Sequence, residues 1–138
     1  MNDTATKTAH TYFDRLAGGD LAGLGELFAP DVVWHQPGVG HLSGTYRGTA
    51  EVFAHLGRFM ELSHGTFRID AVHDIMANGE SVVATIEFSA RRGDYTIAMP
   101  GVDLMRIENG QITEMWLFSA NQRTEDAFWD AAAATQVS

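Results

Sequence analysis

The chain has 138 residues, carries a formal net charge of −9 and contains no cysteine. This length favours one domain spanning residues 1–138. The 9 basic residues are scattered, which argues against nucleic acid as a partner because phosphate binding needs clustered Lys and Arg. Without cysteine there are no disulfides and no thiolate chemistry. No apolar run approaches ~18 residues and the first residues lack a signal pattern, so we expect no membrane span and a cytoplasmic location.

Two helices are expected at the start of the chain. Residues Thr4–Ala17 place apolar side chains at the i, i+3, i+4 and i+7 positions of one helix face, namely Ala9, Tyr12, Phe13 and Leu16. Asp20 is suited to cap a second, short helix. Pro30 closes that helix, because the residue before a proline avoids the α region.

A strand, a loop and a third helix are expected next. Asp31–Gln36 is predicted to be a short strand, and a loop then runs to Gly48. This loop contains Gly38, Gly40 and Gly44, and we expect it to be mobile over the mouth of a cavity. Thr49 is expected to cap a helix whose apolar face is formed by Val52, Phe53, Leu56, Phe59 and Met60.

Four long strands are predicted between Thr66 and Asn121. The turn at Asn78–Gly79 is typical of a hairpin, because both residues tolerate the positive φ that two-residue turns require. A terminal helix is expected over Thr124–Thr135. Helices gathered before one antiparallel meander predict an α+β fold: a cone-shaped, curved antiparallel sheet wrapped around the N-terminal helices. The wide end of such a cone is a natural apolar pocket.

Several stretches resemble the SnoaL-like branch of the nuclear transport factor 2-like superfamily. They are LFAPDVVWHQPG, then LSGTYRG before an amphipathic helix, then IENGQITEMW and a terminal Phe-Trp pair. The resemblance covers nearly the whole chain and implies an α+β cone, a pocket for a hydrophobic small molecule and usually a homodimer formed through the sheet. The superfamily includes polyketide cyclases, isomerases, epoxide hydrolases, dehydratases and pure binding proteins, so fold alone does not assign the reaction.

The chain departs from the family's known acid–base residues. The aspartate that polyketide cyclases and limonene epoxide hydrolase carry after the last strand falls on Asn121, whose amide cannot exchange a proton near pH 7. The Arg-x-Asp pair of the hydrolase falls on Glu87 and Ser89, and its Tyr and Asn fall on Trp34 and Gln36. The epoxide hydrolase constellation is therefore absent.

Asp103 is the first candidate for an acid–base group. Aspartate is depleted in strands, and alternation puts Asp103 on the same face as Met105 and Ile107. If that face lines the cone, burial raises the pKa of the carboxyl toward the range useful for proton transfer. The alternative is an ion-pair partner or a solvated position beside Pro100 and Gly101.

Glu87 and His35 are the other two candidate catalytic residues. Simple alternation turns Glu87 to water, whereas the resemblance implies that its polar row faces the cavity. Histidine is the commonest general base, but His35 and Trp34 face opposite ways on a regular strand, and a structural role is the alternative for His35. None of the six histidines forms a close ligand pair, so we expect no metal and no cofactor.

The substrate is expected to contact aromatic, Met and amide side chains. Six aromatic and Met side chains are expected to shape a hydrophobic site: Trp34, Tyr46, Phe59, Met60, Met105 and Trp116. The alternative is that they pack in the core. Gln36 and Asn121 are expected to orient the substrate through hydrogen bonds.

The sequence thus predicts a small cofactor-independent enzyme that moves protons during cyclisation, isomerisation, or hydration or epoxide opening of a polyketide- or terpenoid-like molecule. The alternatives are a non-catalytic binding or accessory protein of the same fold and a structural dimerisation module. A homodimer through the outer face of the sheet is expected, because apolar residues lie on both sides of the last two long strands.

Overall fold

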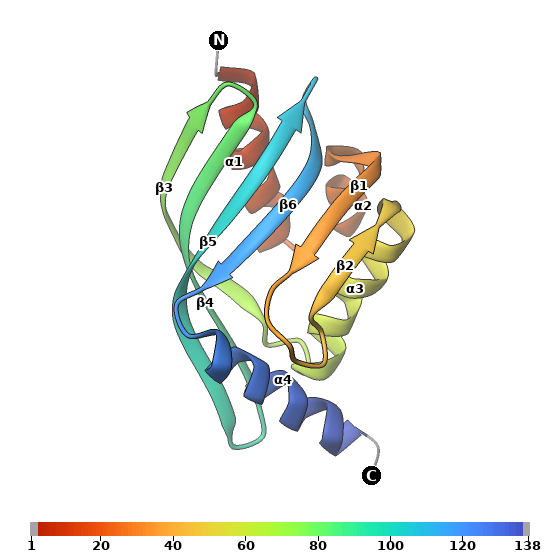
Figure 1. Ribbon diagram of the computed structural model, residues 1–138, viewed down its shortest axis with the longest axis vertical. Coiled ribbons are helices and arrows are strands. Elements are labelled where there is room, and N and C mark those ends of the chain that lie inside the picture. Colours follow the sequence, from red (N-terminus) through yellow and green to blue (C-terminus); the bar gives the residue numbers. More distant parts are fainter. Residues whose placement is uncertain (1–2, 137–138) are drawn as a thin grey trace.

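Residues 3–136 are described by a computed structural model (Figure 1). The helices are α1 (Asp3–Ala17), α2 (Leu21–Leu27), α3 (Gly48–Leu62) and α4 (Gln122–Gln136). The strands are β1 (Phe28–Gln36), β2 (Gly44–Arg47), β3 (Arg68–Asn78), β4 (Ser81–Arg92), β5 (Tyr95–Glu108) and β6 (Gln111–Ser119). No helix within this range is long and apolar enough to cross a lipid bilayer.

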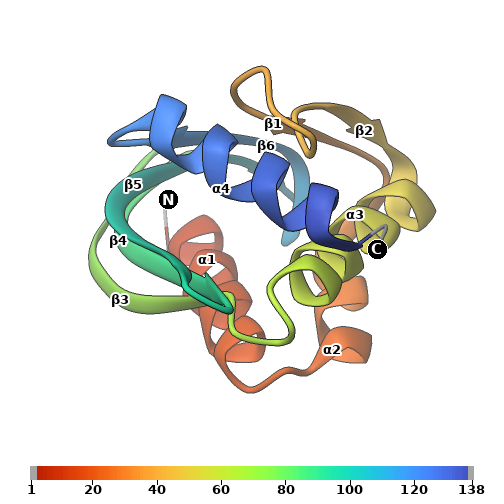
Figure 2. The same cartoon turned by 90° about the horizontal axis from the view of Figure 1, so that it is seen from below.

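The strands form one curved sheet in the order β2-β1-β6-β5-β4-β3. β3 to β6 form the antiparallel meander expected from the sequence, and its hairpins are tight. In the last of them Asn109 and Gly110 both have positive φ, as a right-twisted two-residue turn requires. Figure 2 shows the sheet bending around α1, with α4 crossing the end of the cone. This confirms the predicted α+β fold.

The N-terminal half of the sheet differs from the expectation in three ways. β1 begins at Phe28 instead of Asp31, because a shift in register before Val33 lets the strand continue through Pro30. The loop predicted to run to Gly48 contains β2, which pairs with the edge of β1. β1 also pairs with β6 in parallel, so the sheet is not wholly antiparallel. β1 and β6 are distant in sequence, and local patterns carry no signal for their pairing.

The glycine-containing loop between β1 and β2 is anchored to α4. The backbone N–H of Val39 donates to Asp126 Oδ2 at 2.9 Å, and that of His41 donates to Asp130 Oδ1 at 2.7 Å. Gly40 fits because a Cβ there would lie 3.0 Å from the Asp126 backbone. Two carboxylates one helical turn apart thus hydrogen-bond the loop to α4.

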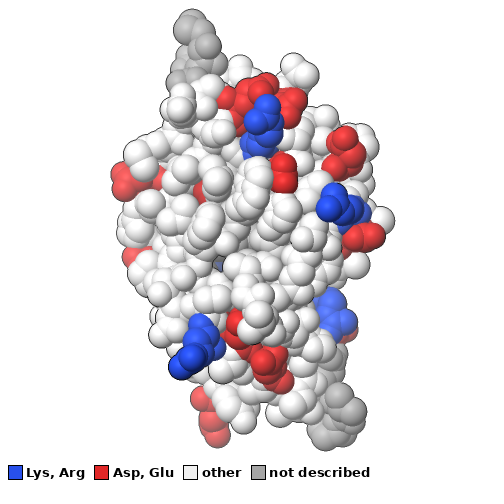
Figure 3. Space-filling view, viewed as in Figure 1, with Lys and Arg blue, Asp and Glu red and all other residues white. Residues whose placement is uncertain are grey.

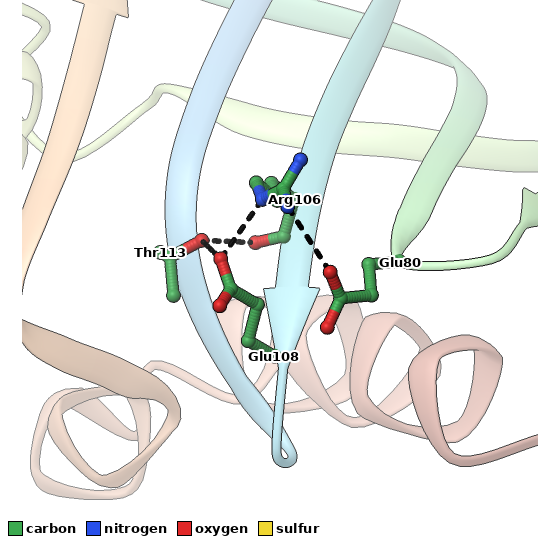
Figure 4. Close-up of polar contacts among 4 residues, drawn as sticks. All are labelled: Glu80, Arg106, Glu108 and Thr113. Atoms are coloured by element: carbon green, nitrogen blue, oxygen red, sulfur yellow. Dashed lines mark hydrogen bonds and ion pairs between the residues drawn. The ribbon is translucent and has the colours of Figure 1, made fainter.

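The two faces of the sheet differ in composition. On β4 the apolar row faces the helices and is buried, and its members are Val82, Ala84, Ile86, Phe88 and Ala90. The opposite face is seen in Figure 3, where charged side chains gather near the ends and edges and the middle is mostly uncharged. One such charged cluster is shown in Figure 4: Arg106 contacts Glu108 at 2.8 Å and Glu80 at 3.1 Å. Thr113 donates to Glu108 at 3.3 Å.

Candidate functional site

A cavity lies between the inner face of the sheet and the helices. Its free space is about 480 Å³ when the mouth is included, and about 50 Å³ when only positions open to the centre of a water molecule are counted. A single water needs roughly 10–15 Å³ on the second measure, so the enclosed part holds a few waters. Its walls are mostly apolar and are formed by Leu16, Trp34, Phe59, Phe67, Ile69, Ile86, Phe88 and Leu117.

Asp103 of β5 projects into this cavity. Its side chain is 3% exposed, and no residue among 3–136 donates a hydrogen bond to its carboxyl. Burial, and next the negative charge of Glu125, raise the pKa of Asp103 to about 7. The carboxyl is therefore divided between its acid and base forms near neutral pH, which suits a group that both accepts and returns a proton.

Glu125 of α4 is a second buried carboxyl in the same cavity. It accepts hydrogen bonds from Ser119 Oγ at 2.5 Å, Gln122 Nε2 at 3.2 Å and Trp129 Nε1 at 3.1 Å. The two carboxyls thus have different surroundings: Glu125 accepts from three donors, while none of the described residues donates to Asp103. Burial, and next the negative charge of Glu125, favour the protonated form of Asp103.

Tyr12 of α1 supplies a hydroxyl to the same cavity. Burial, and next the charge of Asp103, raise the pKa of Tyr12 well above its usual value of 10.0. The phenol therefore stays protonated at neutral pH and can donate a hydrogen bond. Tyr12 falls on the buried face of α1 because it lies three residues after Ala9 and four before Leu16.

The structure brings four of the predicted site residues together. They are Asp103 and three expected substrate contacts, and all of them line the cavity: Trp34, Gln36, Phe59 and Asp103. Trp34 and Gln36 alternate with Val33 and His35 along β1, so they face inward from the same side of the strand.

Glu87 and His35 lie on the outer face of the sheet, away from the cavity. Glu87 alternates with the buried row of β4, and its carboxylate contacts His73 Nε2 at 2.5 Å with both side chains about half exposed. Simple alternation thus describes β4, and the inward orientation implied by the resemblance does not. His35 stacks on Trp116 with ring centroids 5.4 Å apart and contacts Glu114 Oε2 at 2.6 Å. Neither side chain is placed to act with Asp103.

The remaining predicted contacts do not line the cavity. Tyr46 stacks on His55 and donates its hydroxyl to the Leu42 carbonyl. Met60 is exposed and Met105 is packed in the core. Asn121 is also exposed, and its side-chain oxygen accepts the Thr124 N–H at 3.1 Å, which satisfies an amide in the first turn of α4.

Sequence reasoning missed Glu125 and Tyr12 as site residues. Glu125 precedes Phe128 by three residues and Trp129 by four, so it shares the helix face expected to dock in the core. A charged residue on the helix face that packs in the core therefore indicates a buried carboxyl at Glu125. Tyr12 was placed on the apolar face of α1, and only its hydroxyl distinguished it from an ordinary core aromatic. Within residues 3–136, no three acidic or histidine side chains are grouped to hold a metal ion.

The family follows from comparison with known sequences. The model for the SnoaL-like domain matches residues 9–115, most of the chain. The protein belongs to the SnoaL-like family. Among curated relatives, uncharacterised proteins of Mycobacterium tuberculosis and Mycobacterium bovis are each 32% identical over 118 residues, which is 85% of this chain and 89% of the relative. The family match ends before α4, so Glu125 lies outside it.

Solved structures share the fold. A Xanthomonas campestris protein of unknown function with a cystatin-like fold is 49% identical, with a TM-score of 0.88 over 91% of this chain and 97% of its own. TerC, co-crystallised with polyporic acid, is 21% identical with a TM-score of 0.78, over 91% and 98%. A protein of Xanthomonas campestris described as a candidate polyketide cyclase is 20% identical with a TM-score of 0.71, over 93% and 98%. At these last two identities the likeness concerns the fold alone.

Proposed function

We propose that this SnoaL-like protein is a small enzyme that binds a hydrophobic molecule in its cone and transfers a proton through Asp103. The observation that carries the proposal is the Asp103 carboxyl, which lies in a mostly apolar cavity, accepts no hydrogen bond from residues 3–136 and has a pKa of about 7. A group with that pKa is available in both protonation states at the pH of most cells. Tyr12 lies beside it as a protonated donor.

The proposed reaction is removal of a proton from carbon next to a carbonyl. The Asp103 carboxylate forms an O–H bond as the C–H bond breaks, and the electron pair moves to the carbonyl oxygen to give an enolate or enol. The carboxylic acid then returns the proton at another carbon, which gives isomerisation. In cyclisation the enolate carbon first bonds to a second carbonyl carbon of the same molecule, and the acid protonates the alkoxide that forms. The reaction needs no cofactor, because the proton that Asp103 removes from the substrate is returned to the same molecule. Hydration or epoxide opening uses the same acid and base forms.

The proposed substrate class is a polyketide- or terpenoid-like molecule of secondary metabolism. The mostly apolar walls support a hydrophobic ligand. Fold neighbours described as a candidate polyketide cyclase, or crystallised with polyporic acid, point in the same direction. The enclosed space is small, so a ligand with several rings must extend into the mouth.

The second candidate is a non-catalytic binding or accessory protein of the same fold. Two observations favour it: Asn121 replaces the aspartate expected from the resemblance, and the enclosed space holds only a few waters. This alternative retains ligand binding and has no dependence on the protonation of Asp103.

We also propose that the protein is a homodimer through the outer face of the sheet. Phe118 is 54% exposed there, and other apolar side chains of that face are partly exposed, namely Val83, Val102, Leu104 and Trp116. A contiguous apolar surface of this kind is uncommon on a monomer. The mostly uncharged middle of the face in Figure 3 supports a second copy, because a contact there would bury few charged side chains.

The test of the enzyme proposal is hydrogen–deuterium exchange at carbon. Acetophenone, 2-indanone and 2-tetralone are incubated in D₂O with the protein, and loss of the signal of the hydrogens beside the carbonyl is followed by NMR. Wild type is expected to accelerate exchange of at least one ketone, and Asp103→Asn is expected to lose about 10²–10⁴-fold of that rate. Asn is nearly the same size as Asp, so packing is retained.

The matched controls are Glu87→Gln and His35→Gln, which remove titratable groups from the outer face and should leave exchange unchanged. Binding of the ketones without any acceleration of exchange would support the binding protein. Full exchange activity in Asp103→Asn would remove Asp103 from the mechanism.

A further inference from the structure

The Gln36 side chain is held between two ring N–H groups. Its Oε1 lies 3.0 Å from Trp34 Nε1 and 3.0 Å from His55 Nε2. An indole N–H can only donate, so the Gln36 atom facing it must be the oxygen. The same oxygen then accepts from His55, which places the His55 proton on Nε2.

His55 carries a cost that its position must explain. It is 1% exposed, and its Nδ1 is buried without a hydrogen-bond partner among residues 3–136. The ring packs face to face on Tyr46, with centroids 3.9 Å apart, and edge-on to Phe59 at 4.8 Å. A phenylalanine would make the same ring contacts without burying an unsatisfied acceptor. The bond to Gln36 is what a histidine adds at this place.

The amide nitrogen of Gln36 faces the cavity. Gln36 is 8% exposed, and none of the described residues accepts a hydrogen bond from its Nε2, yet that atom is not among the fully buried unsatisfied ones. A second hollow beside Gln36, next to Pro37 and Leu42, has no room for a water. The free N–H groups therefore meet solvent or ligand in the cavity that Asp103 also lines.

We propose that His55 is a positioning residue that, with Trp34, fixes the Gln36 amide so that its N–H groups form a binding subsite for a neutral oxygen acceptor of the ligand. The ligand class is then an apolar molecule with a carbonyl group. This deepens the function proposed above and rests on it only for the reaction: Gln36 stabilises the carbonyl oxygen as charge develops there, while Asp103 exchanges the proton at the neighbouring carbon.

Two donors on Gln36 Oε1 fix which end of the amide faces the cavity. An unrestrained glutamine amide can turn by half a rotation and present its oxygen to the cavity, where it would repel a carbonyl. In the structure Trp34 and His55 both donate to Oε1. If the amide turned, its N–H₂ group would face these two N–H groups, and both hydrogen bonds would be lost. The pair therefore selects ligands that accept a hydrogen bond over ligands that only donate one.

The test compares a ketone with a hydrocarbon of similar shape. Dissociation constants of acetophenone and ethylbenzene are measured by calorimetry for wild type, Gln36→Leu, His55→Phe and Trp34→Phe. One hydrogen bond corresponds to about five- to tenfold in affinity, so wild type is expected to prefer the ketone by that factor and Gln36→Leu to lose the preference. His55 does not line the cavity, so His55→Phe is expected to reduce the preference with ethylbenzene affinity unchanged. Trp34→Phe changes the cavity wall and is expected to reduce the ratio of the two affinities.

A restored donor provides the matched control. His55→Gln offers an amide N–H in place of the ring N–H and is expected to recover part of the preference that His55→Phe loses. The infrared C=O stretch of bound, ¹³C-labelled acetophenone gives a second measurement. It should lie at lower wavenumber in wild type and His55→Gln than in Gln36→Leu, because a hydrogen bond weakens the C=O bond.

The outcomes separate this inference from the enzyme proposal. An unchanged ketone preference in His55→Phe and Trp34→Phe would mean that the two rings are structural only. An unchanged preference in Gln36→Leu overturns the subsite itself. A normal ketone preference without Asp103-dependent exchange overturns the reaction and leaves the carbonyl subsite intact.

Discussion

The inner and outer faces of the sheet treat similar side chains in opposite ways. Asp103 and Glu87 are carboxyls on the adjacent strands β5 and β4. Asp103 lies inside, accepts no hydrogen bond from the described part of the chain and has a pKa of about 7. Glu87 lies outside, about half exposed, and contacts His73 at 2.5 Å. A carboxyl in a strand is therefore informative only once its face is known, because desolvation is the larger cause of the shifted pKa.

The aromatic residues repeat the contrast. Inside, Trp34 donates its indole N–H to Gln36 and forms part of the cavity wall. Outside, Trp116 stacks on His35 on a surface that is partly exposed. The inner Trp34 orients a polar side chain in a mostly apolar cavity, whereas the outer Trp116 adds to an apolar surface. The first arrangement suits chemistry and the second suits association.

The largest effect on folding is expected from removing the charge of Asp103. Its pKa is raised in the folded state, so the folded state binds more protons than the unfolded chain between about pH 4 and pH 7. The stability that Asp103 contributes is fully present below about pH 4 and is lost as pH rises to about 7. Asp103→Asn should therefore be more stable than wild type, with a gain that increases by about 2–3 kcal/mol from pH 5 to pH 8.

Denaturant unfolding at several pH values measures this gain. Glu87→Gln is the control from the outer face and should show no comparable change in stability between pH 5 and pH 8. If Asp103→Asn gains the same stability at pH 5 and at pH 8, the raised pKa of Asp103 would be contradicted. The expected combination, higher stability with lost exchange, would indicate that the inner face sacrifices stability for function.

A smaller effect on the fold, and a large one on association, is expected from Leu104→Lys. Leu104 faces outward beside Trp116 on β6, within the proposed dimer surface. A lysine there places a charge in the interface of each copy, and burying it without a partner is costly. Light scattering should show a dimer for wild type and a monomer for Leu104→Lys at micromolar concentration. Since the inner face is untouched, the ketone affinity should be retained, and a wild-type monomer would reject the dimer.

The smallest effect is expected from the exposed pair on β3 and β4. Glu87→Gln removes the contact with His73, which joins two side chains that are each about half exposed. Ion pairs at such sites contribute about 0–1 kcal/mol because water and salt screen them. Thermal unfolding should therefore change little, and the change should shrink further at high salt. A loss of several kcal/mol would mean that the outer face holds Glu87 more rigidly than its exposure implies.

Local patterns in the sequence determined the elements and the composition of each face. The spacing of Tyr12 and Leu16 gave a helix face, and the alternation of Asp103 with Met105 and Ile107 put all three on one side of β5, where they are buried. At the expected Asn78–Gly79 turn, Gly79 has positive φ, whereas Asn78 is the last residue of β3. These features depend on φ, ψ and side-chain period within a few residues, so a single sequence contains them.

Tertiary structure alone decided which of those faces form a site. The pairing of β1 with β6 and the docking of α4 join residues far apart in the chain, and they bring Gln36, Asp103 and Glu125 to one cavity. The same closure leaves Glu87 and His35 outside. The raised pKa of Asp103 and the lowered pKa of His55, about 4 because of burial and next the charge of Arg58, exist only after water is excluded. Desolvation is a property of the packed interior, and no local pattern encodes it.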